Sequence, residues 1–157
     1  MKYVITILLI ILPFFSFAIG PKEKIVELEG VSKDEIYKRA LLFITKEFKS
    51  AKDVIQLQDK EEGRIIGKGA LLYNAAPFNP GLNYSGHFFF TVTIECKDGK
   101  YRYVIDQIRH EATLPSYTVD LRNTRKRKIT EAAETNINDF TRLLERSMLQ
   151  SSKLGDW

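Results

Sequence analysis

Residues 87–106 read HFFFTVTIECKDGKYRYVID, a pattern that predicts two antiparallel strands joined by a tight turn. Apolar and polar side chains alternate on both sides of Asp98-Gly99, a pair that is typical of a two-residue hairpin turn in which both residues have positive φ. Such a turn sets the register, so that Lys97 faces Lys100 and Glu95 faces Arg102. One face of the hairpin is then expected to enter the core, with Phe90, Val92, Ile94, Cys96, Tyr101, Tyr103 and Ile105. The other face is expected to meet solvent or a partner, with Thr91, Thr93, Glu95, Arg102 and Asp106.

The flanking sequence predicts three more strands and two helices. Ser32-Lys33-Asp34-Glu35 has the form of a capping box, and apolar residues follow it at helical spacing from Ile36 to Phe48. Strands are predicted at 25–29, 54–59 and 64–73, and a second helix at about 130–150. A long loop is expected at 74–86 and an irregular segment at 112–130. The order β-α-β-β-β-β-α favours an α+β domain with both helices on one face of a single antiparallel sheet.

The first 18 residues differ from the rest, because they contain 14 apolar residues and one charged residue, Lys2. A basic start, an apolar run and the small residues Ser16 and Ala18 are typical of a signal peptide cleaved after Ala18. Residues 19–157 then form a single domain, and the protein is expected to be periplasmic or secreted. An uncleaved membrane anchor is the alternative, because the apolar stretch is about long enough to span a bilayer. Cys96 is the single cysteine, so the exported protein can have no intramolecular disulfide.

Short motifs follow one another along residues 31–112: SKDEIY (32–37), AKDVIQ (51–56), DKE (59–61), IGKG (66–69) and KDGKYR (97–102). In this order they resemble a family of secreted proteins of Gram-negative bacteria, the domain of unknown function 4468 with a TBP-like fold. The resemblance implies the same β-α-β4-α order that the apolar pattern predicts. It implies no catalytic residue and no ligand, and the fold name alone does not imply DNA binding.

His87 and His110 are the two histidines of the chain. The hairpin register places them opposite each other on the non-core face, close enough for both imidazoles to bind one transition metal. Two ligands make a weak site, so two surface histidines are the alternative, and a bulge between them would break the pairing. Phe89 and Ile108 are expected to oppose each other on the same face, either under the 74–86 loop or as an exposed apolar patch.

Five positive charges lie within seven residues, at Arg122, Arg125, Lys126, Arg127 and Lys128. This basic tract could contact anionic headgroups, lipopolysaccharide or nucleic acid. A solvated connector is favoured instead, because the net charge of the chain is only +4 and acidic residues follow the tract. Nucleic acid is not expected as a partner, since no aromatic residue lies within the tract.

The sequence contains no recognisable catalytic motif. Gly67-Lys68-Gly69 lacks the spacing and the Ser/Thr of a phosphate loop, and a strand rather than a helix is predicted after it. We therefore expect a non-catalytic envelope protein without a cofactor, whose partner is an envelope protein or a small ligand. The predicted binding surface is the uncovered sheet face: Phe89, Thr91, Thr93, Arg102, Val104 and Ile108. The alternatives are a hydrolase acting on an envelope component, with its site in the 74–86 loop, and a peripheral membrane protein held by the basic tract at 122–128.

Overall fold

A long hairpin forms the centre of a five-stranded antiparallel sheet. The computed structural model describes residues 20–48, 54–74, 85–112 and 122–150. Its elements are β1 (Lys22–Glu27), α1 (Lys33–Glu47), β2 (Ile55–Asp59), β3 (Arg64–Tyr73), β4 (Gly86–Lys97), β5 (Lys100–Ala112) and α3 (Arg122–Met148). The strands lie in the order β1-β5-β4-β3-β2, and neighbouring strands are antiparallel. This confirms the predicted α+β fold and its order of elements.

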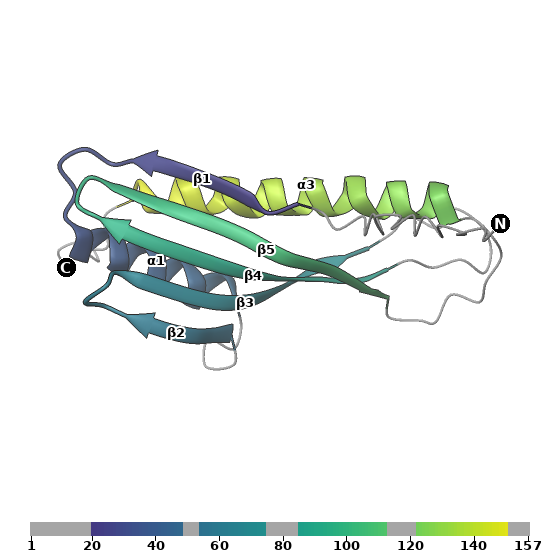
Figure 1. Cartoon of the computed structure of the whole chain (residues 1–157), viewed down its shortest axis with the longest axis horizontal. Helices are drawn as coiled ribbons and strands as arrows, with labels where there is room; N and C mark the ends of the chain where they lie inside the picture. The colour runs from purple at the N-terminus through teal and green to yellow at the C-terminus, as the bar shows by residue number, and fades with distance from the viewer. Residues whose placement is uncertain (1–19, 49–53, 75–84, 113–121, 151–157) are drawn as a thin grey trace, which may run out of the picture.

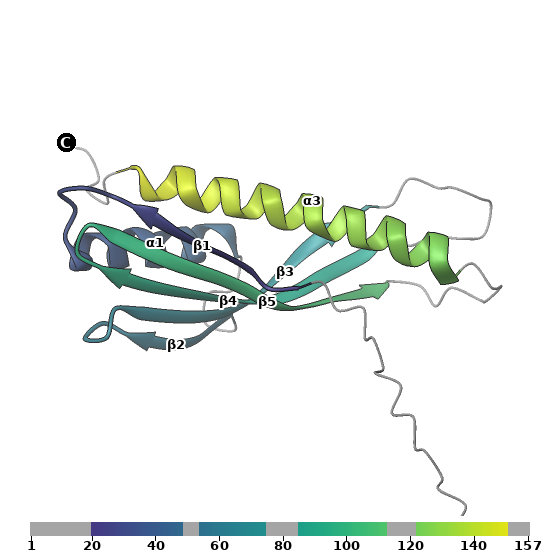
Figure 2. The ribbon, with the colours of Figure 1, turned by 45° about the horizontal axis from the view of Figure 1, so that its top comes forward.

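Both helices lie on the same side of the sheet, as predicted (Figure 1). The turned view shows the same arrangement, with α3 running along the length of the sheet (Figure 2). α1 contacts β3, β4 and β5, and α3 contacts β5 and α1. Within the described residues, no helix or strand covers the other side of the sheet. We call this uncovered side the open face.

The turn between β4 and β5 docks on the connection between β1 and α1. Gly99 has a φ of 74°. Its carbonyl accepts a hydrogen bond from the Leu28 amide at 2.7 Å, and its own amide donates to the Val31 carbonyl at 2.9 Å. The Asp98 carboxylate accepts from the Lys33 amide at 2.7 Å. The two-residue turn and its register are confirmed, but only Gly99 has the positive φ that was expected of both residues. We attribute the unexpected φ of Asp98 to these contacts, because they constrain the backbone of the turn in addition to its own sequence.

α1 begins after Ser32, as the capping box predicts. The Ser32 hydroxyl accepts a hydrogen bond from the Glu35 amide at 3.3 Å, and the Glu35 carboxylate accepts one from Arg39 at 2.8 Å. Arg39 also donates to the Met148 carbonyl in the last turn of α3 at 2.7 Å. Since the last carbonyls of a helix have no partner within the helix, Arg39 both caps α3 and joins the two helices.

The centre of the core is a cluster of four phenylalanine rings between the helices and the sheet. The ring centroid of Phe140 lies 5.3 Å from that of Phe43, 5.9 Å from that of Phe48 and 5.0 Å from that of Phe90. Gly69 of β3 lies directly against this cluster, because a Cβ added there would be 2.4 Å from Phe90 and 2.8 Å from Phe48. β3 pairs with β4 without a bulge. A close approach, and not a bulge, therefore explains the glycine at this position.

Polar contacts hold α3 against β1 and β5. The Glu145 carboxylate forms an ion pair with Lys24 at 2.8 Å and accepts a hydrogen bond from the Tyr103 hydroxyl at 2.9 Å. Burial, followed by this bond to Glu145, raises the pKa of Tyr103 to about 12. Lys22 donates to the Thr141 hydroxyl at 3.0 Å. These contacts attach the edge strand β1 to the helix layer.

Two element boundaries differ from the predictions. α3 begins at Arg122, so the irregular segment expected up to 130 is helical from residue 122 onward. This stretch is rich in Arg and Lys, which favour helix, but it lacks the apolar periodicity that marks a buried helix face. β1 lies at Lys22–Glu27 and not at 25–29, because its pairing with β5, invisible in the local sequence, determines where it starts and ends.

Candidate functional site

The open face is partly apolar and carries five of the six residues predicted for a binding surface. Phe89, Thr91, Thr93, Arg102 and Val104 lie on it, and each is half-buried. Three apolar side chains on the same face are strongly exposed: Ile25 (58%), Leu57 (41%) and Leu72 (60%). They extend the candidate surface from β1 across the sheet to β2, beyond the hairpin on which the prediction rested.

Ile108, the sixth predicted residue, was placed on the wrong face. A bulge interrupts the β4–β5 pairing, because Thr91 pairs with Asp106 whereas Phe89 pairs with Arg109. Gln107 at the bulge has a φ of 51°. The extra residue reverses the faces beyond it, so Ile108 packs partly buried against the core. Arg109 takes its place on the open face, with its guanidinium carbon 4.8 Å from the centre of the Phe89 ring.

The same bulge separates the two histidines. His87 pairs with Glu111 and His110 pairs with Phe88, so the predicted pairing of His87 with His110 was wrong. His87 is exposed on the open face beside Phe89. His110 lies on the helix side, with its ring centroid 5.1 Å from that of Phe88 and 5.9 Å from that of Tyr73. The two imidazoles therefore cannot share a metal ion, and among the described residues no group of three His, Cys, Asp or Glu side chains could hold one.

A row of ion pairs crosses the open face at its hairpin end. Glu95 on β4 pairs with Arg64 on β3 at 3.1 Å and with Arg102 on β5 at 2.9 Å. Arg102 also pairs with Glu23 on β1 at 2.8 Å. We call these four residues the charged belt. The hydrogen bond from Arg102, aided by the charge of Arg64, holds the pKa of Glu95 below its usual range despite partial burial. The belt contains two positive and two negative groups, so it neutralises itself.

We expect Glu95→Gln to reduce the stability of the protein in a pH-dependent way. Because the pKa of Glu95 is lower in the folded protein than its ordinary value of 4.5, the ionised carboxylate stabilises the fold above about pH 4.5. This contribution is lost as the pH falls through the lowered pKa. At pH 7 the variant should lose about 1 kcal/mol of unfolding free energy, and the difference should shrink in acid. Urea unfolding at neutral and at acidic pH measures both the loss of unfolding free energy and its dependence on pH.

The control for this prediction is Glu111→Gln, which removes a more exposed ion pair with Arg109. It should change the unfolding free energy less than Glu95→Gln does. A deficit in Glu95→Gln that is equally large at pH 7 and at pH 3 would contradict the electrostatic origin of the effect.

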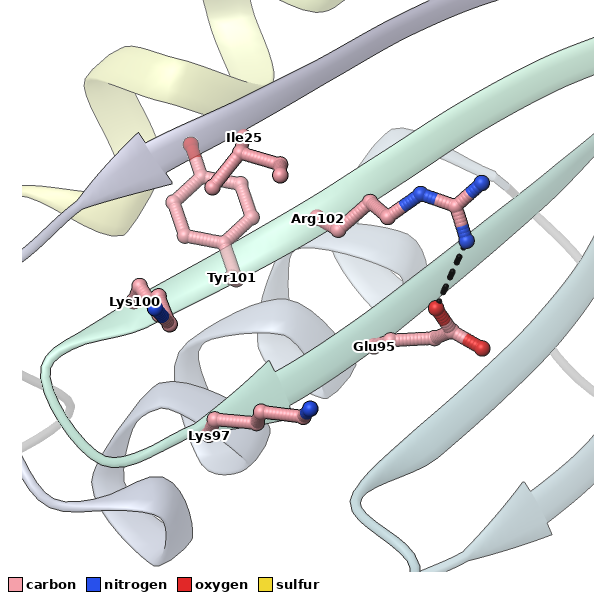
Figure 3. A pocket seen from close by; sticks show the side chains of 6 residues that line it. All are labelled: Ile25, Glu95, Lys97, Lys100, Tyr101 and Arg102. Atoms are coloured by element: carbon pink, nitrogen blue, oxygen red, sulfur yellow. Dashed lines mark hydrogen bonds and ion pairs between the residues drawn. The ribbon is translucent and has the colours of Figure 1, made fainter.

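A cavity of about 220 Å³ lies beside the charged belt (Figure 3). Its lining residues are Ile25, Glu95, Lys97, Lys100, Tyr101 and Arg102. Lys97 and Lys100 face each other across the hairpin, as the register predicted, and both are exposed. Neither lysine was predicted to be a site residue, although the register set by the Asp98-Gly99 turn already places the two residues opposite each other.

Three predicted features lie wholly or partly outside the described residues. The signal peptide at 1–18 and residues 75–84 of the predicted loop lie outside them, as do the side chains of Arg122, Arg125 and Lys126. Arg127 is exposed and pairs with Glu131 at 3.4 Å along α3. Thus 122–128 begin a helix and do not form a connector. Among the described helices, none is both long and apolar enough to cross a membrane.

Comparisons with known proteins find a family and a fold. The family model "Domain of unknown function (DUF4468) with TBP-like fold" matches residues 23–111. A DUF4468 family protein from Bacteroides ovatus ATCC 8483 has a similar structure, with a TM-score of 0.61, 16% identity, and coverage of 86% of this chain and 89% of that one. A TBP-like protein from Parabacteroides distasonis ATCC 8503 is also similar in structure, with a TM-score of 0.62 and 11% identity. The match covers 83% of this chain and 93% of that one. No curated protein matches. At these identities the similarity of the two structures concerns the fold alone.

Proposed function

The chain belongs to the DUF4468 family of domains of unknown function with a TBP-like fold, and from this premise we propose that it is an exported, non-catalytic envelope protein that binds a protein partner through its open face. One observation carries the proposal. Both helices pack on one side of the sheet, which leaves a partly apolar face of five strands without a covering helix or strand in the described residues.

The composition of the open face supports a protein as the partner. Exposed apolar side chains, among them Leu57 and Leu72, lie beside threonines and paired charges. Such a mixture is typical of protein interfaces that form between separately folded partners. A small ligand usually occupies a pocket of roughly 300–1,000 Å³, whereas the cavity at the hairpin end of this face has about 220 Å³.

Export is supported by the composition of residues 1–18. Cleavage after Ala18 is expected to give a mature chain that starts at Ile19. This chain is expected in the periplasm or outside the cell. N-terminal sequencing of the protein recovered from cell fractions tests this directly. A protein that still starts at Met1 and stays with the membrane would instead support the uncleaved anchor.

Substitutions on the open face test the binding proposal. We expect Phe89→Asp and Leu72→Asp each to reduce capture of the partner from envelope extracts at least tenfold, because each places a carboxylate in a desolvated, partly apolar interface. Neither change should unfold the protein. Leu72 is exposed, and the carboxylate introduced at position 89 would lie beside Arg109.

The matched controls are Leu42→Asp and Leu143→Asp. Their side chains are 45% and 44% exposed, but they lie on α1 and α3, away from the open face. Thermal unfolding of all four variants identifies any that fail to fold. A captured protein counts as the partner only if it is lost with the open-face variants and kept with the helix variants. The opposite pattern would place the binding surface on the helix side.

A further inference from the structure

We propose that the cavity at the hairpin end of the open face binds carboxylate groups of an acidic segment of the partner protein. This inference rests on the proposed function and names the chemistry of the partner. Three observations support this inference: the position of the cavity, the charge of its lining residues and the single exposed apolar side chain among them.

The cavity lies between β1 and the end of the β4–β5 hairpin. In Figure 3, Ile25 of β1 lies on one side, and Lys97 and Lys100 flank the turn on the other. The lining contains three cationic side chains and one carboxylate. Its net charge therefore favours an anion.

Lys97 and Lys100 are the groups available to that anion. Like charges directly opposite each other on a sheet repel and destabilise it. Neither lysine forms an ion pair within the part of the chain that the structure describes, although Glu27 faces Lys100 across the β1–β5 pairing. Arg102, in contrast, is already paired with Glu95 and with a second carboxylate. An anion bound beside both lysines would offset their like charges.

The surroundings favour carboxylates on a protein segment over other anions. A nucleic acid gains affinity from many phosphates along a run of cations, but the neighbouring charged belt is neutral overall. A free phosphate ion would gain nothing from Ile25, which is 58% exposed at the cavity. A peptide that alternates acidic and apolar residues can use both the lysines and this isoleucine.

The test uses a short blocked peptide of alternating leucine and glutamate, titrated into the isotope-labelled protein while backbone amide shifts are recorded. We expect shifts at Ile25, Lys97 and Lys100, and binding that weakens as the salt concentration rises from about 0.05 to 0.5 M. The double variant Lys97→Gln/Lys100→Gln should weaken binding about tenfold, because two exposed ion pairs are lost. Lys68→Gln, which changes an exposed lysine elsewhere on the open face, should leave binding unchanged.

Three results would overturn the inference. They are equal binding of a peptide with glutamine in place of glutamate, equal binding of inorganic phosphate at the same amides, and unchanged peptide binding by the lysine double variant. If one of these occurs while Phe89→Asp still prevents capture of the partner, the open face stands as the binding surface and only the carboxylate site is wrong. If the peptide binds as expected but Phe89→Asp leaves capture unchanged, the proposed function is wrong and the carboxylate site remains.

Discussion

Phe140→Ala should lower the free energy of unfolding by about 3–5 kcal/mol. Phe140 is 2% exposed, and its ring contacts three other rings, which come from α1, from the residue that caps the end of α1 and from β4. Removal of this ring deletes aromatic contacts that join α3 to α1 and to the sheet. Because the surrounding rings are held by two helices and a sheet, they can close the resulting cavity only in part. Chemical denaturation of the purified protein, followed by far-UV circular dichroism, measures the loss.

Phe89→Ala is the matched control for this prediction. It removes the same side chain from the open face, where Phe89 is half-buried and outside the ring cluster. We expect a loss of about 1 kcal/mol, from partial burial and the contact with Arg109. If both variants lost the same amount, the four-ring cluster would not be the centre of the core.

Gly69→Ala should cost about 2–3 kcal/mol, which is large for the addition of one methyl group. The added Cβ would lie 2.4 Å from the Phe90 ring and 2.8 Å from the Phe48 ring. Both rings are buried and both pack against Phe140. Room for the methyl group therefore requires a shift of the whole cluster. The midpoint of denaturant unfolding should fall accordingly.

Gly67→Ala provides the comparison two residues earlier on the same face of β3. A Cβ at this position would lie 3.4 Å from Val92 and 3.5 Å from Val54, which is ordinary contact. In addition, alanine loses less backbone entropy than glycine on folding. We expect a change within about 0.5 kcal/mol. Equal losses in the two variants would indicate a general requirement for glycine in β3 and would contradict the close approach at Gly69.

The sequence predicts much of this fold because the turn within the hairpin determines the register of β4 and β5. Strict alternation and the Asp98-Gly99 turn correctly assign the faces of Phe90 to Ile105. The prediction fails at Gln107, where the strand bulges without a glycine to mark it. One extra residue is enough to move Ile108 to the core side and to separate His87 from His110.

The candidate site was predictable only in part. The lysine pair depends on a local turn, so the opposition of Lys97 and Lys100 follows from sequence. The charged belt joins residues of four strands, and Glu23 and Arg64 enter it only through strand order and register. Pairing between strands that are distant in the sequence produces no periodic pattern in either strand, so the local sequence does not reveal it. Similarly, the charged first turns of α3 carry no apolar pattern from which a helix could be predicted.

The most direct test of the open face as a binding surface is photo-crosslinking in cells. A photoreactive amino acid replaces Thr93, near the middle of the open face, in one protein and Leu143, on the exposed side of α3, in the other. We expect a discrete covalent adduct with a partner protein from position 93 and none from position 143. An adduct from position 143, with none from position 93, would contradict a partner bound to the open face.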